Sequence, residues 1–382
     1  MASSKPGNTL PLTRDSVSAA RALIQPHIHD TPVLTNTTLT NLASTPQSAD
    51  ALKGTQWEGK APAKPRFRLF FKCENFQRIG AFKVRGAFHA TMRLTEQEGL
   101  EEALALAART FSIPAHIVMP SISTPSKISG TRAQNATLHF SGSTSAEREA
   151  VVADVIKNTG ATLIPPYDDP NIILGQGTMA LEIQEQVEKL LEANNGKLDA
   201  VIAPCGGGGM LSGIAVALKD TGIRVFGAEP SFQGADDARR GVQAGSRVES
   251  VKTLTIADGL RTPLGHHNWG IVSDPTFVQG LYAVTEQNIK DAMMLVLERM
   301  KCFVEPSAVV GLATVLYNED FRNMVQREAG EEGWNVGVVF SGGNTTIEAI
   351  TKIFAGVADE TAERQEGVLG SDGARVAENV AG

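Results

Sequence analysis

Residues 200–213 read AVIAPCGGGGMLSG, an apolar stretch followed by four consecutive glycines and a segment that can continue as a helix. The apolar part, Ala200–Pro204, is typical of a strand buried on both faces. Glycines at the junction permit positive φ angles and close backbone approach, so several N–H groups can point at one anion beside a helix amino end. The stretch therefore predicts an α/β fold with a phosphate-binding turn at residues 206–209.

Two common nucleotide-binding motifs do not account for this turn. No Gly-Lys-Ser or Gly-Lys-Thr follows it, as a nucleotide hydrolase would need, and its spacing differs from G-x-G-x-x-G. The alternative is a flexible connection between a strand and a helix, which rarely needs four glycines in succession. Phosphate binding remains the favoured interpretation.

Strand and helix patterns alternate on both sides of the turn, which predicts a mostly parallel sheet covered on both faces. Asp15 is the expected cap of the first helix. The length of 382 residues suggests two to three domains. We expect strands at 67–74, 115–120, 136–140, 200–204, 224–229 and 336–340, and helices at 16–24, 82–93, 124–135, 145–159, 177–192 and 211–219.

Composition excludes several classes of function. The formal net charge of −7 argues against nucleic acid or an anionic membrane as a partner. No apolar run is long enough to span a membrane, and the polar first fifteen residues do not form a secretory signal. The three cysteines are scattered, which fits reduced thiols in the cytoplasm better than a disulfide framework. We therefore expect a cytoplasmic enzyme that acts on a small molecule.

Two further segments carry chemically useful side chains. Residues 75–87 read NFQRIGAFKVRGA and place Lys83 beside Phe82, just inside a helix start; an apolar neighbourhood there would favour a neutral, nucleophilic amine. Residues 341–344 read SGGN and place Ser341 directly after an apolar strand, where open sheets bind ligands. Taken alone, a solvated lysine and a plain turn are the commoner interpretations of these two segments.

Together the three segments resemble, in order, the lysine motif, the phosphate loop and the pyridine-nitrogen site of fold-type II pyridoxal-phosphate (PLP) enzymes. The serine racemase and serine/threonine ammonia-lyase branch is the most similar, and the likeness covers residues 16–355. Four shorter motifs support that branch: IPA at 113–115, GQGT at 175–178, TIADG at 255–259 and EPS at 305–307.

The resemblance implies a fold like that of the tryptophan synthase beta subunit, with two open parallel-sheet domains and the cofactor between them. Residues 15–94 and 166–355 would form the large domain, with a loop insertion at 44–64. Residues 95–165 would form the small domain, while 1–14 and 356–382 would be disordered. Members of the branch are homodimers, so we expect one here.

Residue by residue, the resemblance assigns Lys83 to the Schiff base with PLP and to removal of the substrate α-proton. Phe82 would pack against the cofactor ring. Ser341 would face the pyridine nitrogen, and its neutral hydroxyl would favour prompt loss of a β leaving group over long-lived carbanion chemistry. The amides expected to hold the phosphate are those of Gly206, Gly207, Gly208, Gly209 and Met210.

The branch also commonly binds a divalent cation near the phosphate loop. The matching groups here are the Glu229 carboxylate, the Ala235 carbonyl and the Asp237 carboxylate, hard oxygen ligands suited to Mg²⁺ or Ca²⁺. The alternative is an acidic surface loop paired with Arg239 and Arg240.

One family motif is absent. Between the lysine helix and residue 113 the family has a strand that ends in a Ser-Ser-Gly-Asn-His loop, which binds the substrate carboxylate and supplies racemases with their second base. Residues 93–108 read RLTEQEGLEEALALAA and contain neither the strand nor the loop. Either the sequence derives from a mis-spliced or truncated version of an active enzyme, or the protein binds PLP with impaired chemistry; the intact flanking sequence favours the first.

The predicted reaction is α,β-elimination from serine, threonine or a related β-hydroxy amino acid, which gives a 2-oxo acid and ammonia. A serine racemase is the first alternative and a catalytically impaired PLP-binding protein the second. A β-replacement enzyme is disfavoured by the TIADG stretch.

Overall fold

The computed structural model describes residues 10–93, 102–123, 125–142, 145–161, 163–194 and 196–355. The chain divides into two compact units, Met1–Asn344 and Thr345–Gly382. In the second unit, residues 347–355 are helical. Most of the ends that were expected to be disordered, 1–14 and 356–382, lie outside the described residues.

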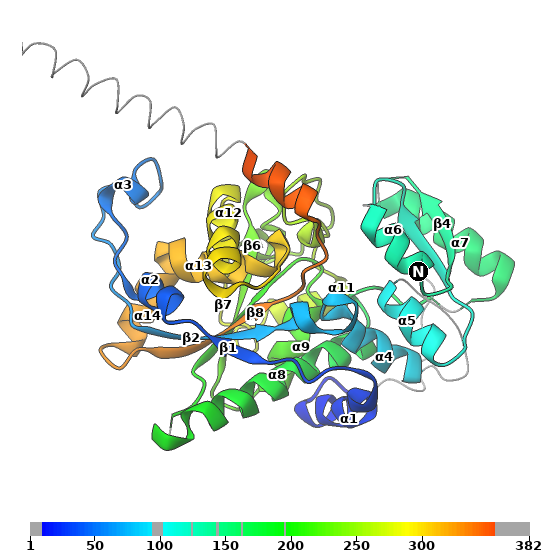
Figure 1. Ribbon diagram of the computed structural model, residues 1–382, viewed down its shortest axis with the longest axis horizontal. Helices are drawn as coiled ribbons and strands as arrows, with labels where there is room; N and C mark the ends of the chain where they lie inside the picture. The colour runs from blue at the N-terminus through cyan, green and yellow to red at the C-terminus, as the bar shows by residue number, and fades with distance from the viewer. Residues whose placement is uncertain are drawn as a thin grey trace, which may run out of the picture. The chain divides into compact units, whose positions relative to one another are not determined.

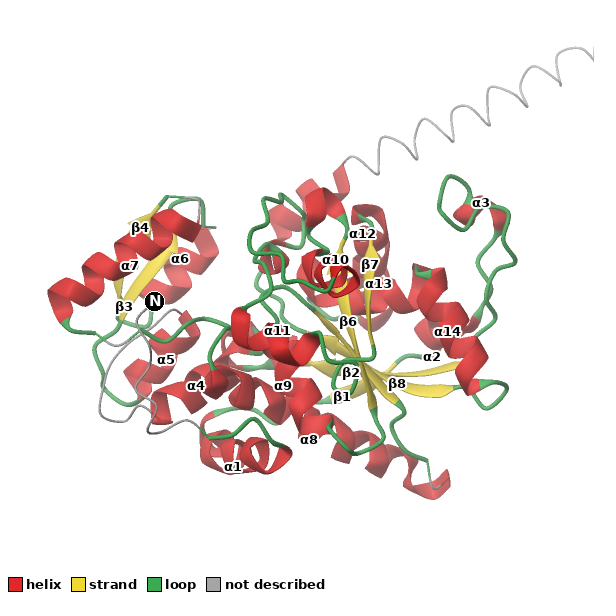
Figure 2. Cartoon of the chain, turned by 180° about the vertical axis from the view of Figure 1, so that it is seen from behind, coloured by secondary structure: helices red, strands yellow, loops and turns green. Residues whose placement is uncertain are grey.

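A six-stranded sheet forms the centre of the first unit, with the strand order β1-β2-β8-β5-β6-β7. All neighbours in it are parallel except β1, which pairs antiparallel with β2. Figure 2 shows these strands fanning across the centre of the unit. The strands are β1 Val33–Thr35, β2 Phe67–Cys73, β5 Ala200–Pro204, β6 Arg224–Pro230, β7 Gly280–Val284 and β8 Trp334–Phe340.

Helices cover both faces of this sheet, as the alternating pattern predicts. Helices α8 and α9 lie on one side, and α12 and α13 lie on the other (Figure 1). Every residue of β5 and β8 is buried, which explains their continuous apolar character. Among the described residues, no helix combines the length and the apolar composition needed to cross a membrane.

The observed helix bounds differ from the expected ones mainly at amino ends. The first helix begins at Arg14, and its cap is Thr13 rather than Asp15, because the Thr13 side chain accepts from the Ser16 amide. Helix α8 begins seven residues earlier than expected, after the cap Asp169. The helices are α1 Arg14–Ile24, α2 Thr37–Ser44, α3 Ala49–Leu52, α4 Lys83–Arg93, α5 Glu102–Thr110, α6 Pro125–Arg132, α7 Ser145–Thr159, α8 Pro170–Leu191, α9 Gly209–Leu218, α10 Asp237–Ala244, α11 His266–Val272, α12 Glu286–Leu295, α13 Val310–Tyr317 and α14 Glu319–Ala329.

A separate two-stranded parallel sheet pairs β3, His116–Pro120, with β4, Thr137–Ser141. It lies in the segment expected to form the small domain, with α6 and α7 beside it (Figure 2). Residues 94–101, which connect α4 to α5, lie outside the described residues, so the predicted absence of a strand and a loop there is not tested. The division into a large and a small domain stays a prediction.

Helix α8 is packed closely against two other helices through its glycines. A Cβ on Gly175 would lie 2.6 Å from the Gly86 Cα of α4, and a Cβ on Gly177 would lie 2.5 Å from the Gly213 carbonyl of α9. Side chains at these positions would push the helices apart. The glycines of the GQGT motif thus allow α4, which begins at Lys83, and α9, which follows the glycine turn, to pack closely against the same helix, α8.

A buried ion network joins the same elements. The Arg85 guanidinium of α4 donates at 2.7 and 2.8 Å to Glu74, which follows β2, and at 2.6 and 2.7 Å to Glu182 of α8. Lys72 of β2 also donates to Glu182, at 2.6 Å. Burial alone would raise the pKa of Glu182, but Arg85 and Lys72 lower it below its usual value. Two positive and two negative side chains therefore balance inside the protein.

Removal of one partner from this network should be costly, because it leaves uncompensated charge in the interior. We expect Arg85→Met to lower the free energy of unfolding by about 3–5 kcal/mol. The matched control is Arg21→Met, because Arg21 pairs with Glu185 at the surface; its loss should cost at most about 1 kcal/mol. Urea unfolding of both variants measures the difference, and equal small losses would contradict the assigned role of the network.

Candidate functional site

The three motifs converge because each follows the carboxyl end of a strand, and those strands are neighbours. Strands β2, β8 and β5 lie side by side and parallel. The lysine motif follows β2, Ser341 follows β8, and the glycine turn follows β5. Carboxyl ends of adjacent parallel strands meet at one edge of a sheet, which is where ligands bind in open α/β sheets.

The turn before Lys83 is tied directly to the segment after β8. The Phe82 amide donates to the Ser341 carbonyl at 3.1 Å, and the Gly343 amide donates to the Gly80 carbonyl at 2.9 Å. An isolated bridge between Ala81 and Gly342 completes the contact. Lys83 and Ser341, more than 250 residues apart in the chain, are thereby brought together.

The side chains of Ser341, Phe82 and Lys83 differ in exposure. Ser341 is buried, Phe82 is half-buried and Lys83 is exposed, in the first turn of α4. Lys83 therefore lies at the helix start, beyond the strand ends, and its assignment as the cofactor lysine stays a prediction.

The glycine turn has the properties of an anion site. Gly208 caps α9 with φ of 92°, a conformation that favours glycine, and no side chain caps the helix. Among the described residues, no backbone hydrogen bond starts from the amides of residues 206–210. Free amides at the positive end of a helix are the arrangement that binds phosphate. The residues present therefore fit the phosphate of PLP.

Residues that the sequence did not single out for this purpose hold the turn in place. The Asn268 side chain donates to the Gly207 carbonyl at 2.8 Å, and the Tyr167 ring lies where a Cβ on Gly207 would be, with a ring carbon 2.3 Å away. Asp168 accepts from the amides of His266 and His267 and so caps α11. These contacts depend on tertiary packing, and no local sequence signal marks them.

The TIADG motif also reaches the glycine turn. A Cβ on Gly206 would lie 3.2 Å from the Gly259 carbonyl oxygen and 2.9 Å from the Cα of Leu260, which leaves no room for a side chain at Gly206. The EPS motif supports this segment, because the Gly259 amide donates to the Ser307 hydroxyl at 3.0 Å.

The proposed metal ligands lie at the end of the next strand, β6. Glu229, Ala235 and Asp237 are all buried. Glu229 accepts from the amides of Ala238 and Arg239 at 3.0 and 2.8 Å. Burial, reinforced by the charge of Asp237, raises the pKa of Glu229 well above its usual value, and burial raises the pKa of Asp237 to about 6.

The alternative interpretation was an acidic loop paired with arginines. Such pairing is present, but it involves neither of the two carboxylates predicted to bind metal. Arg239 and Arg240 pair with Asp236, at 3.3 and 3.0 Å, rather than with Glu229 or Asp237. In the described part of the chain, no cluster of three or more His, Cys, Asp and Glu side chains could hold a metal. A cation here would need the Ala235 carbonyl as its third ligand.

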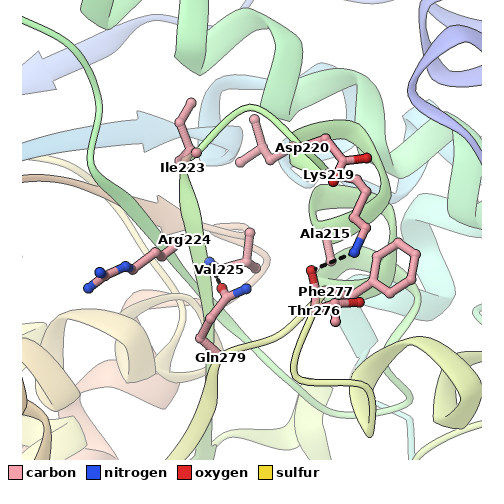
Figure 3. Close-up of a pocket in the computed structure, with 11 residues that line it drawn as sticks. Ala215, Lys219, Asp220, Ile223, Arg224, Val225, Thr276, Phe277 and Gln279 are labelled. Atoms are coloured by element: carbon pink, nitrogen blue, oxygen red, sulfur yellow. Dashed lines mark hydrogen bonds between the residues drawn. The ribbon is translucent and has the colours of Figure 1, made fainter.

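A pocket of about 270 Å³ lies at the opposite end of β6, beside Arg224 and Val225 (Figure 3). It contains none of the expected site residues. Lys219 donates to the Thr276 carbonyl at 3.0 Å, and Gln279 accepts from the Val225 amide at 2.6 Å. These polar groups already have partners, so the pocket offers little to a ligand.

Comparison with known proteins agrees with this geometry. The family model described as "Pyridoxal-phosphate dependent enzyme" matches residues 58–342. A serine racemase of Arabidopsis thaliana is 36% identical over 352 residues, which are 89% of this chain and 95% of that protein. A beta-hydroxyaspartate dehydratase of Paracoccus denitrificans is 34% identical over 351 residues, 88% of this chain and 98% of that protein. The structure of maize serine racemase superimposes with a TM-score of 0.76 at 34% identity, covering 92% of this chain and 99% of that one.

A methyl group at the centre of the glycine turn should weaken cofactor binding. A Cβ on Gly208 would lie 2.4 Å from Leu264, whereas a Cβ on Gly222, whose φ is also positive at 80°, would meet no atom within 4 Å. Both alanine variants incur left-handed strain of about 1–2 kcal/mol, but only Gly208→Ala should lower PLP affinity, by at least about tenfold. Equilibrium dialysis measures the affinity, and equal affinities for the two variants would contradict the assignment.

Proposed function

The chain belongs to the family of pyridoxal-phosphate-dependent enzymes, and on this premise we propose that it eliminates the β-hydroxyl of serine, threonine or a related β-hydroxy amino acid. The products would be a 2-oxo acid and ammonia. The observation that carries the proposal is the convergence of Lys83, Ser341 and the uncapped glycine turn at adjacent strand ends.

Each of these groups has a defined task in the proposed reaction, and Lys83 has two. When bound, PLP withdraws electrons from the substrate α-carbon. The Lys83 Nζ holds the cofactor and then takes the α-proton, while the amides of residues 206–210 bind the phosphate. Ser341 presents a neutral hydroxyl to the pyridine nitrogen, and a neutral partner favours departure of the β-hydroxyl over long-lived charge at the α-carbon.

Relatives named beta-hydroxyaspartate dehydratase and serine racemase support two candidate reactions. Elimination is favoured, because racemisation needs a second base on the opposite face of the substrate. The family's serine for that role belongs to the loop that residues 93–108 lack. An impaired PLP-binding protein is the third possibility, and it would bind cofactor without turnover. A homodimer remains the expected assembly.

We also propose that Glu229, the Ala235 carbonyl and Asp237 bind Mg²⁺ or Ca²⁺. Support comes from the burial of two neighbouring carboxylates, which raises the pKa of both, and from the charge of Asp237, which raises the pKa of Glu229 further. A divalent cation would compensate both charges. The cation would also brace β6 and α10 beside the glycine turn.

Replacement of Lys83 tests the main proposal. We expect Lys83→Ala to lower 2-oxo acid formation from L-serine, L-threonine or threo-3-hydroxyaspartate by about 10²–10⁴-fold, because the base is lost. The visible absorbance of the lysine-bound cofactor should disappear with it, while Lys53→Ala, a change at an exposed lysine, should alter neither readout. Chiral chromatography of the remaining amino acid distinguishes the racemase, and cofactor absorbance without any product in the parent protein would identify the impaired binder.

Chelation tests the metal proposal. Removal of divalent cations with EDTA should lower the melting temperature, and Mg²⁺ or Ca²⁺ at about 100 times its Kd should restore about 2.7 kcal/mol of stability. Glu229→Gln should abolish this response. Asp236→Asn should keep it, because the Asp236 carboxylate is engaged by arginines. A response that survives Glu229→Gln would show that the cation binds elsewhere.

A further inference from the structure

Two histidines meet on the two-stranded sheet of β3 and β4, and neither has a part in the proposed reaction. His116 is the first residue of β3, and His139 is the third residue of β4. The Nδ1 atom of His116 lies 3.2 Å from the Nε2 atom of His139, and the ring centroids are 5.4 Å apart. The two rings therefore present one nitrogen each to the space between them.

The register of the two strands places these side chains together. His116 is paired with Thr137, two residues before His139. Residues two apart on a strand point to the same face, so both histidines lie on one face of the sheet as diagonal neighbours. Ile117 and Leu138 belong to the opposite face, which packs into an apolar cluster with α5. Because a shift of one residue would expose that cluster, the apolar face also fixes the histidine pair.

The pair is open to solvent and available to bind a metal. Both side chains are half-buried, so a dissolved cation can reach them. Burial, together with the neighbouring His116, lowers the pKa of His139 below its usual value. The His139 ring is therefore neutral at pH 7, and neutral imidazole is the form that binds metal ions.

The distance between the two nitrogens is that of a chelating pair. Tetrahedral Zn²⁺ binds imidazole nitrogens at about 2.0–2.1 Å, so two nitrogens on one ion are about 3.3 Å apart. The observed 3.2 Å differs from this by little. Without a cation, a single hydrogen atom lies between the two nitrogens. A cation replaces that hydrogen atom and uses the lone pairs of both rings.

We propose that His116 and His139 chelate a divalent transition metal of the class Ni²⁺, Cu²⁺ or Zn²⁺, the ions that imidazole suits. Water would fill the other coordination positions, since no third His, Cys, Asp or Glu joins the pair among the described side chains. The site differs in donor type from the oxygen ligands of Glu229 and Asp237. Hard oxygen donors suit Mg²⁺ and Ca²⁺, so the two sites select different ions.

A bound ion would hold β3 against β4. The described part of this sheet has two strands, and two strands alone form a sheet of marginal stability. The ion reaches both histidines only when the strands are in register. It therefore binds the folded sheet in preference to the open one and stabilises it by mass action.

The other histidines are less suited to chelate an ion. The His27 ring is stacked against a phenylalanine, and His29 and His89 each direct one ring nitrogen at a backbone carbonyl, at 3.2 and 2.7 Å. His266 and His267 are exposed and adjacent in sequence, but their ring centroids are 6.1 Å apart, farther than the 5.4 Å of the proposed site. This adjacent pair supplies the control.

Electron paramagnetic resonance of bound Cu²⁺ tests the ligands directly. The holoenzyme is freed of metal with EDTA, exchanged into buffer without chelator and given one equivalent of Cu²⁺. We expect hyperfine coupling to two nitrogens, and His116→Ala or His139→Ala should abolish that pattern and weaken Cu²⁺ binding by at least about tenfold. His266→Ala should change neither. Equal Cu²⁺ affinity in His116→Ala and His266→Ala would overturn the proposal.

Hydrogen exchange of the parent holoenzyme tests the same site without any substitution and without turnover. Zn²⁺ at about ten times its Kd should slow amide exchange in peptides from β3 and β4 about tenfold, because opening of the sheet releases the ion. A peptide from α2 should exchange at an unchanged rate. Unchanged exchange in β3 and β4 at saturating Zn²⁺ would contradict a metal that joins the two strands.

Discussion

The paired charges of Arg85, Glu74 and Glu182 are the interaction on which the site depends most. Arg85 lies two residues after Lys83, Glu74 lies directly after β2, and Glu182 lies on α8. Because all three are buried, none can find a substitute partner in water. The lysine helix therefore has one position relative to the sheet edge and to α8. The close contact of Gly86 with Gly175 is possible only in that position.

Parallel strand order explains how distant segments form one site. The lysine motif, the glycine turn and Ser341 are spread over most of the chain, yet they follow three neighbouring strands. The sheet supplies a common edge, α8 supports the helices on both sides of that edge, and an uncapped helix end supplies the positive potential. In the proposed reaction, Lys83 would provide the base and Ser341 a neutral partner. Few side chains thus take part in the proposed chemistry, and the packing of the sheet against its helices holds them in position.

The features that the sequence did not predict are contacts rather than residue types. Thr13 rather than Asp15 caps the first helix, since either residue type can do so and only the backbone geometry decides. Tyr167, Asp168 and Asn268 support the glycine turn from remote positions. Such contacts join residues far apart in the chain and follow no fixed spacing in the sequence, so no local sequence pattern predicts them.

By itself the sequence determined the alternation of strands and helices, the glycine turn between a buried strand and a helix, and the order of the motifs, because these follow from hydrophobic periodicity and from the backbone freedom of glycine. It also indicated the missing loop between α4 and α5. Only the tertiary structure decided which strands are neighbours, which carboxylates neutralise Arg85, and which remote residues hold the glycine turn. Those relations join residues far apart in the chain. They arise from packing and the balance of buried charge, which act through space rather than along the sequence.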